Sequence, residues 1–308
     1  MRSEHKKKKK KRKTFKIIGF TLLILFIGGG AYAASVYQSL AGAIHTMQGA
    51  AHKTDKRVDD IKFKSQDPFS LLILGVDERK NDKGRSDTMI VMTINPKQES
   101  IQLLSLPRDT RTEIIGKGTN DKMNHAYAYG GVNMSINTVE AYLDIPIDYY
   151  VKMNMEGFQD IVNAVGGVTV DNDMDLAYKG YSFKKGTIDL NGKEALIYSR
   201  IRKEDPRGDY GRQMRQRQVI QAVMKKGSSL STLTNYDDIF EALGKNVETN
   251  LSFNEMLSIQ KNYKSSLKKI EQYTLEGDNQ KVDGVWYNIV SEETKLEAQN
   301  RVKTHLGL

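Results

Sequence analysis

The sequence predicts a three-layer α/β/α domain, in which helices flank a central mixed sheet and one N-terminal transmembrane helix precedes it. Three observations lead to this fold class. The continuous apolar run SLLILGV, residues 70–76, is typical of a strand that is buried on both faces. Helical and strand patterns alternate from residue 132 onward, as they do in α/β domains. Residues 17–36 carry no charge and are long enough to cross a bilayer.

The N-terminal charge sets the expected topology. Residues 1–16 contain ten Lys or Arg and one Glu, which equals the whole formal net charge of +9. By the positive-inside rule, this tail lies in the cytoplasm, residues 17–36 span the membrane, and the rest of the chain lies outside. We therefore expect a single-pass type II protein of the cell membrane with an extracellular domain. The alternative is a signal peptide cleaved after Ala31, Tyr32 and Ala33.

The remaining composition excludes several classes of function. Residues 17–308 hold 37 basic and 37 acidic residues, so the basic pI gives no reason to expect nucleic acid as a partner. The chain has no cysteine, which excludes disulfides, a lipoprotein anchor and a Cys nucleophile. Among the five histidines only His125 is placed to serve a site in the domain, because the others lie in the tail, in the segment after it or near the C-terminus. A His-rich zinc site is therefore excluded, and a Ser-His-Asp triad lacks its G-x-S-x-G motif.

Two further segments complete the expected organisation. Residues 37–67 are small, polar and charged, with weak helical periodicity, and we expect them to form an extracellular stalk. Residues 68–308 show no internal repeat or low-complexity linker and are expected to form one domain. Within it we expect helices at 132–143, 156–165, 237–243 and 253–267, at the end from about residue 292, and after a capping box of Asn191 and Glu194. Further strands are expected at 149–155, 168–171, 270–275 and 285–289.

The first three expected strands bring charged residues to one edge of the sheet. Residues 86–96 and 99–110 read as a hairpin beside the strand 70–76. Asp77, Asp87 and Arg108 then reach the same edge, where open α/β sheets bind ligands. Carboxylates suit Mg²⁺ and guanidinium groups suit phosphate, so the combination indicates phosphoryl or pyrophosphate chemistry. Each acid, taken singly, is also typical of an ordinary turn or loop.

The most basic part of the domain is LIYSRIRKEDPRGDYGRQMRQRQ, residues 196–218, with seven basic and three acidic residues. A helix that begins near Asp209 places Arg212, Arg215 and Gln216 on one face. Arginines around a helix N-terminus favour phosphate oxygens, because the N–H groups and the helix dipole add to their charge. A solvated charged face is the alternative.

The next arginine along this helix is expected to differ from its neighbours. Arg217 lies about 100° around the helix from Gln216. We therefore expect Arg217 to face water and its replacement by Lys to be almost neutral.

Several motifs together resemble the LytR-CpsA-Psr family: ILGVDERKNDKGRSDTMIV, LLSLPRDT, DKMNHAYAYGG, VKMNMEGFQDIVNAVGGVTV and LNGKEALIYSRIRKEDPRGDYGRQMRQRQVI, behind a lysine-rich anchor. The resemblance covers residues 1–290 in order. It implies that residues 68–308 form an extracytoplasmic catalytic domain. It also implies the reaction: a glycan phosphate, from wall teichoic acid or a related anionic polymer, moves from a polyprenyl-pyrophosphate carrier to peptidoglycan, and polyprenyl phosphate is released.

The resemblance also implies roles for individual residues. Asp77 and Asp87 would bind Mg²⁺ as the cofactor. The residues implied in catalysis are Arg108, Arg200, Arg202 and Asp205. Those implied in binding the pyrophosphate are Arg85, Lys122, Arg212, Arg215 and Gln216.

The polyprenyl chain needs an apolar slot, which in this family lies between the sheet and its helices. The candidate apolar faces are those of 132–143, 158–165 and 219–224, and each also fits an ordinary core. Two other functions would use the same arginines. One is a hydrolase that releases the glycan phosphate to water, and the other is a protein that binds the lipid-linked glycan without turnover.

Overall fold

The computed structural model describes residues 38–308, apart from residues 40, 44, 50–51, 78–83 and 228–242. The expected cytoplasmic tail at 1–16 and the transmembrane helix at 17–36 lie outside the described residues, as do residues 237–242 of the helix expected at 237–243. In the part that is described, no helix combines the length and the apolar character needed to span a membrane.

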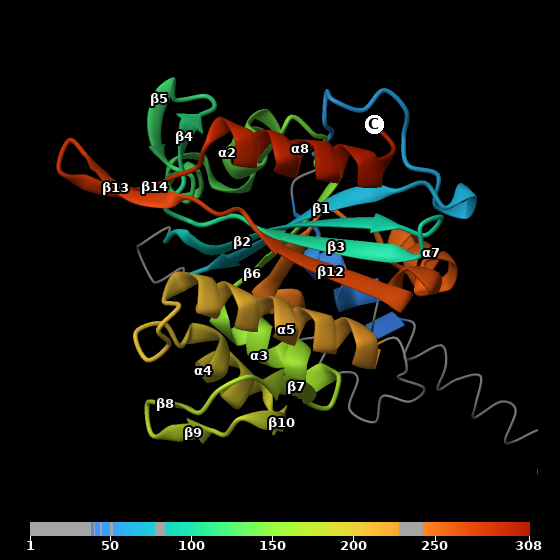
Figure 1. Ribbon diagram of the computed structural model, residues 1–308. Helices are drawn as coiled ribbons and strands as arrows, with labels where there is room; N and C mark the ends of the chain where they lie inside the picture. Colours follow the sequence, from blue (N-terminus) through green and yellow to red (C-terminus); the bar gives the residue numbers. More distant parts are fainter. Residues whose placement is uncertain (1–37, 40, 44, 50–51, 78–83, 228–242) are drawn as a thin grey trace, which may run out of the picture.

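A six-stranded mixed sheet forms the centre of the molecule (Figure 1), in the order β11-β6-β1-β2-β3-β12. Its strands are β1 (Phe69–Val76), β2 (Ser86–Asn95), β3 (Ser100–Ser105), β6 (Tyr149–Met153), β11 (Val247–Thr249) and β12 (Lys269–Thr274). The first three form an antiparallel meander, while β6 runs parallel to β1 and β12 runs parallel to β3. The predicted hairpin and the mixed central sheet are both confirmed.

Helices cover both faces of this sheet, which explains the unbroken apolar run in β1. Leu72 and Leu74 point towards α2 (His125–Leu143) and α8 (Glu292–Leu306), which lie above the sheet in Figure 1. Leu71 and Ile73 point to the opposite face, where the core includes residues of η1 (Phe63–Ser65), α5 (Asp209–Gly227) and α7 (Phe253–Asn262). Because successive side chains alternate between two buried faces, a strand in this position has no polar side. The predicted α/β/α layering is confirmed.

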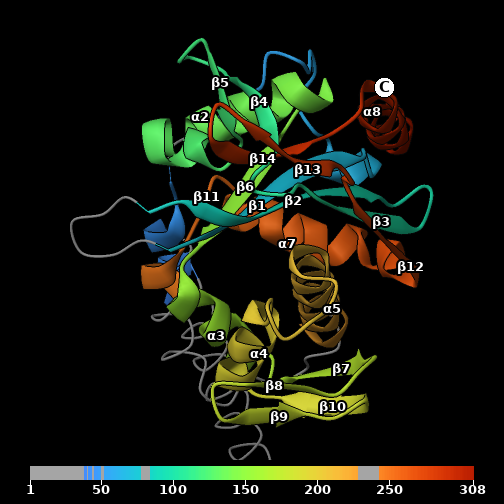
Figure 2. The ribbon, with the colours of Figure 1, turned by 60° about the vertical axis from the view of Figure 1, so that its left-hand side comes forward.

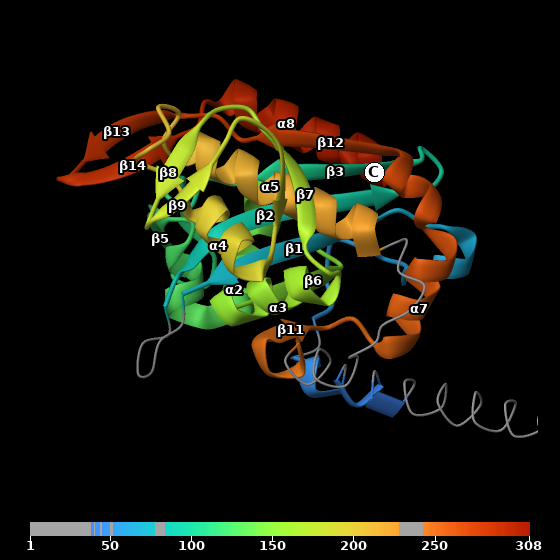
Figure 3. The same ribbon diagram turned by 90° about the horizontal axis from the view of Figure 1, so that it is seen from below.

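A third apolar cluster builds a subdomain below the sheet. It joins α3 (Met155–Ala164), α4 (Gly192–Arg200) and α5 to four short strands (Figure 2), which are β7 (Val168–Asn172), β8 (Leu176–Tyr178), β9 (Tyr181–Phe183) and β10 (Gly186–Leu190). The predicted capping box of Asn191 and Glu194 begins α4. The strand predicted at 168–171 exists, but it pairs with β10 and lies outside the central sheet. Viewed from below, α4 and α5 lie between the short strands of this subdomain and the central strands (Figure 3).

Two hairpins lie beyond one end of the sheet, β4 (Arg111–Ile114) with β5 (Thr119–Lys122) and β13 (Asp278–Val282) with β14 (Val285–Ile289). The hairpin β13–β14 projects away from the sheet in Figure 1. At the other end, η2 (Lys264–Lys268) leads into β12. The last part of the expected stalk packs on the domain, since Phe63 is buried and Arg57 Nε donates to Asp148 Oδ1 at 2.6 Å.

His305, which was not expected to serve a site because it lies near the C-terminus, is buried between α8 and the sheet. Only 1% of the residue is exposed. Its Nδ1 lies 2.7 Å from Thr93 Oγ1, and its Nε2 lies 2.9 Å from Ser100 Oγ. Burial disfavours the imidazolium and lowers the pKa of His305 to about 4.

We expect this histidine to make stability depend on pH. The folded-state pKa lies below the unfolded value of about 6.5, so the neutral ring stabilises the fold fully above pH 6.5, and this contribution is lost as the pH falls towards 4. The loss should approach roughly 3 kcal/mol. Urea unfolding of the soluble domain between pH 7 and 4 measures it, with His305→Gln as the comparison because Gln does not titrate. Equal pH dependence in both proteins would contradict the assignment.

Candidate functional site

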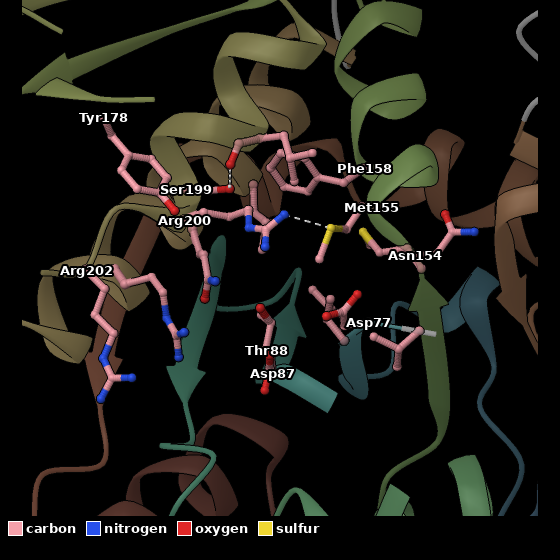
Figure 4. A pocket seen from close by; sticks show the side chains of 18 of the residues that line it. Asp77, Asp87, Thr88, Asn154, Met155, Phe158, Tyr178, Ser199, Arg200 and Arg202 are labelled. Atoms are coloured by element: carbon pink, nitrogen blue, oxygen red, sulfur yellow. Dashed lines mark hydrogen bonds between the residues drawn. The ribbon is translucent and has the colours of Figure 1, made fainter. Parts of the chain in front are cut away.

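Two carboxylates and an arginine lie near each other where β1 ends and β2 begins. Asp77 directly follows β1 and Asp87 is the second residue of β2. Arg108, which lies in the loop after β3, donates from Nη1 to Asp87 Oδ1 at 2.7 Å. The sheet edge predicted from the sequence therefore exists. Asp77 and Asp87 both line one cavity of about 470 Å³ (Figure 4).

This first cavity lies between the sheet and the subdomain, and one part of it is apolar. The apolar lining comes from Ile73, Val76, Met153, Met155, Phe158, Leu196 and Ile220. Polar and charged side chains line most of the rest: Asp77, Asp87, Thr88, Asn154, Tyr178, Ser199, Arg200, Arg202, Lys203, Glu204, Arg212 and Gln216. Figure 4 shows Arg200 near Met155 and Phe158, with Asp77 and Asp87 on another side of the cavity. Such a cavity can take a molecule with an apolar chain and an anionic group.

A second cavity, of about 560 Å³, adjoins the first, because Asp87 and Arg202 line both. It adds three of the predicted site residues, Arg85, Arg108 and Lys122. Nine of the eleven predicted site residues thus line one cavity or the other. Asp205 and Arg215 are the two that line neither.

The guanidinium groups of Arg108 and Arg212 concentrate positive charge between the two cavities. Burial alone would lower the pKa of Arg108, but the carboxylate of Asp87 outweighs it and the pKa is raised. Burial lowers the pKa of Arg212. The ion pair with Asp209, at 2.6 Å, raises this pKa but offsets the effect of burial only in part. Nε of Arg108 and Nε of Arg212 are both buried and make no hydrogen bond to any described residue. Buried donors without acceptors are costly, so these two suit the oxygens of an anionic ligand.

Asp205 and Arg215 form a buried ion pair instead of facing a ligand. Both side chains are fully buried, and Arg215 Nη1 donates to Asp205 Oδ2. Arg215 also donates to the carbonyl oxygens of Tyr198 and Ile201, which fastens α5 to the end of α4. Burial would raise the pKa of Asp205, but hydrogen bonds from Arg207 and Arg215 lower it to about 2. The shared ligand-facing side predicted for Arg212, Arg215 and Gln216 is therefore wrong for Arg215.

Close packing at this ion pair explains a glycine in α5. A Cβ atom at Gly211 would lie 2.0 Å from Asp205 Oδ2. Only a residue without a side chain lets the first turn of α5 approach the carboxylate.

Arg217 is buried, and the prediction that it faces water is wrong. Only 6% of the residue is exposed. Its Nη1 donates to Ser105 Oγ at 2.6 Å and to Thr274 Oγ1 at 2.8 Å, so the side chain lies between α5 and the sheet. Burial lowers the pKa of Arg217 to about 10. A lysine cannot reproduce this planar geometry, so a neutral effect of Arg217→Lys is no longer expected.

The apolar faces proposed for the lipid chain separate into two groups. Phe158 of α3 and Ile220 of α5 line the first cavity, in agreement with the faces at 158–165 and 219–224. The face at 132–143 instead packs on the opposite side of the sheet, where Ile136 and Val139 are buried. Sequence reasoning missed Met153 and Met155, because no local pattern marks single apolar residues that reach a cavity from separate elements.

The chain offers few groups that could hold a metal. Within the described ranges, no group of three or more His, Cys, Asp or Glu side chains could do so. The two carboxylates of Asp77 and Asp87 line the same cavity, however. A pair of this kind fits Mg²⁺, which commonly uses one or two protein carboxylates and completes its shell with phosphate oxygens and water.

Known proteins resemble this chain over most of its length. The model of the LytR_cpsA_psr family matches residues 32–304. A Bacillus cereus protein named polyisoprenyl-teichoic acid–peptidoglycan teichoic acid transferase TagU is 51% identical over 96% of this chain and 98% of its own length. The crystal structure of Bacillus subtilis TagU aligns at a TM-score of 0.64 with 48% identity, covering 78% of this chain and 97% of that chain. A structure of TagT bound to LIIa-WTA aligns at 0.72 with 33% identity, covering 85% and 99%. The chain therefore belongs to the LytR-CpsA-Psr family.

Proposed function

We propose that this protein transfers a glycan phosphate, from wall teichoic acid or a related anionic polymer, from a polyprenyl-pyrophosphate carrier to peptidoglycan, with Mg²⁺ as cofactor. The observation that carries the proposal is the first cavity, which joins an apolar slot to a cluster of arginines and two carboxylates. The name of the Bacillus cereus relative and the LIIa-WTA bound to TagT support the same substrate class.

The arginines would bind the pyrophosphate of the donor. A pyrophosphate brings two or more negative charges into a partly desolvated site, so fixed cations are needed to offset the loss of water. Arg108 and Arg212 present buried Nε donors that make no hydrogen bond to a described residue, and Arg202 lines both cavities. Charge that grows on the leaving phosphate during transfer would be stabilised by the same guanidinium groups.

Asp77 and Asp87 would hold the magnesium ion. When bound, Mg²⁺ supplies charge neutralisation at the phosphate oxygens. The chain's own contribution is orientation: the 2.7 Å hydrogen bond from Arg108 to Asp87 fixes one carboxylate beside the arginine cluster. Asp205 is buried in its ion pair with Arg215, so it would act by holding the loop that carries Arg202 in position.

The apolar part of the first cavity would hold the start of the polyprenyl chain. Met155 and Phe158 of α3 and Ile220 of α5 offer the apolar side chains for this contact. The lysine-rich residues 1–16 and the uncharged residues 17–36 support a membrane anchor with the domain outside the cell. That anchor would keep the cavity close to the lipid carrier in the outer leaflet.

Product analysis tests the proposal. The protein is incubated with Mg²⁺, lipid-linked donor and short uncrosslinked peptidoglycan oligomers. A phosphodiester-linked product identifies a transferase, free glycan phosphate a hydrolase, and the absence of turnover a binding protein. Arg108→Lys keeps the charge but loses the bidentate geometry, so transfer should fall about tenfold or more. Arg301→Lys, an exposed change on α8, is the matched control and should leave the rate unchanged.

A further inference from the structure

The second cavity has a wall that the donor does not require. Besides Asp109 and the charged residues assigned to the donor site, it is lined by Asn124, His125, Asn279, Trp286 and Tyr287. The last three come from the hairpin β13–β14, which projects beyond the sheet (Figure 1). A transferase has two substrates, and this cavity opens on the same phosphate-binding cluster from another side. Its lining therefore bears on the identity of the second substrate.

The hairpin is fastened to the loop that carries Arg108. Asn288 N donates to the carbonyl oxygen of Asp109 at 2.9 Å, and Asn288 Nδ2 donates to Thr110 Oγ1 at 3.3 Å. Tyr210 of α5 donates from its hydroxyl to the carbonyl oxygen of Gly277 at 2.9 Å. The base of the hairpin is thus held at a set position relative to the catalytic cluster, although its side chains extend into solvent.

Two aromatic residues of this hairpin line the cavity, and they differ in their surroundings. The ring of Tyr287 lies near two cations, with Arg111 Cζ and Lys122 Nζ at 5.8 and 5.9 Å from its centroid. Trp286 is 60% exposed, which is unusual for the largest apolar side chain. An exposed indole in a cavity that Asn279 also lines combines a flat apolar face with hydrogen-bonding groups. A sugar ring complements both features, because its face carries C–H groups that pack on an indole and its rim carries hydroxyls that form hydrogen bonds.

Asn124 and His125 supply polar atoms to another part of the lining. Asn124 is 3% exposed, and its Oδ1 makes no hydrogen bond to any residue that the structure describes. His125 Nδ1 lies 2.8 Å from Asp121 Oδ2, which also accepts from the Tyr129 hydroxyl at 2.6 Å. Burial would raise the pKa of Asp121, but hydrogen bonds from Tyr129, His125 and Lys122 N–H lower it. An ionised Asp121 fixes the proton on His125 Nδ1 and leaves Nε2 as the basic nitrogen.

We propose that the second cavity binds the saccharide acceptor, that Trp286 stacks on a sugar ring, and that His125 accepts the proton of the attacking hydroxyl. This proposal rests on the transferase function proposed above. In the step, the hydroxyl oxygen forms a bond to the phosphorus that carries the donor glycan, and the bond from this phosphorus to the bridging oxygen breaks. Polyprenyl phosphate leaves with the electron pair, and the hydroxyl proton moves to Nε2 of His125.

Tryptophan fluorescence tests acceptor binding without any turnover. Trp286 is the single tryptophan of the chain, so the emission reports on this site alone. Uncrosslinked peptidoglycan oligomers should change the emission saturably, whereas geranylgeranyl pyrophosphate, a mimic of the donor lipid, should not. A response to the lipid alone, or none to the oligomers, would overturn the acceptor assignment. Because the donor is absent, this result is independent of whether the protein is a transferase or a hydrolase.

Steady-state kinetics then distinguish the role of Trp286 in acceptor binding from the role of His125 in catalysis. Trp286→Ala should raise KM for the oligomers about fivefold and leave KM for the lipid donor unchanged. Val285→Ala is the matched control, since Val285 is 43% exposed on the same strand and lies outside the cavity. His125→Gln should lower kcat about a hundredfold or more while KM for both substrates and the fluorescence response persist. A raised donor KM in Trp286→Ala would place the donor glycan here instead, and wild-type kcat in His125→Gln would remove its role as the base.

The failure of either proposal is recognisable. If the wild-type protein gives no phosphodiester product, the transferase function fails whatever the fluorescence shows. If the wild type transfers glycan but both variants match it, the transferase function stands and the acceptor site is wrong. Circular dichroism of each variant verifies that the fold is kept.

Discussion

Replacing Asp77 by Asn should lower magnesium-dependent transfer about a hundredfold or more without unfolding the domain. The amide keeps the shape of the side chain but loses the charge that would hold the cation, and a carboxylate at the end of a strand contributes little to the core. Asp87→Asn should be at least as damaging, because it also removes the ion pair with Arg108. Initial transfer rates over a range of Mg²⁺ concentrations measure both variants.

Glu297→Gln is the matched control for these changes. Glu297 is exposed on α8 and lines neither cavity. We expect its rate and its Mg²⁺ dependence to match those of the wild type. Wild-type rates in Asp77→Asn and Asp87→Asn would show that the two acids are ordinary loop residues.

Removing Arg215 should destabilise the domain by about 3–5 kcal/mol, the largest stability effect expected at this site. Arg215→Ala leaves the Asp205 carboxylate buried with only part of its hydrogen bonding, and it also leaves the carbonyl oxygens of Tyr198 and Ile201 without these donors. Urea unfolding followed by circular dichroism measures the change. The double variant Asp205→Leu with Arg215→Met should recover part of the loss, because it removes both buried charges.

Arg200→Met provides the contrast within the same basic stretch. Arg200 is exposed and lines the first cavity, so this variant should lose transfer activity while its free energy of unfolding stays within about 0.5 kcal/mol of the wild type. If Arg215→Ala kept full stability and raised KM for the donor, Arg215 would be a ligand-binding residue after all.

Local pattern determined much of the fold. The apolar run of β1, the hairpin of β2 and β3, and the capping box of α4 each depend on residues that are close in sequence. The alternation of side chains along a strand and the residue types of turns are patterns over a few residues, so these elements could be predicted directly from the sequence. The meeting of Asp77, Asp87 and Arg108 followed from them, because consecutive antiparallel strands return the chain to the same edge.

Tertiary packing decided what the side chains do. The period of α5 relates Arg212, Arg215 and Arg217 by angle, but it does not show that a carboxylate lies under Arg215 or that the sheet lies under Arg217. Both contacts join residues from separate elements, as do the walls of the two cavities. The sequence by itself therefore determined the family, the layers and the charged edge of the sheet. Only the three-dimensional structure separated the arginines that can reach a ligand from those that hold the fold, because burial is a property of the neighbours brought in by the rest of the chain.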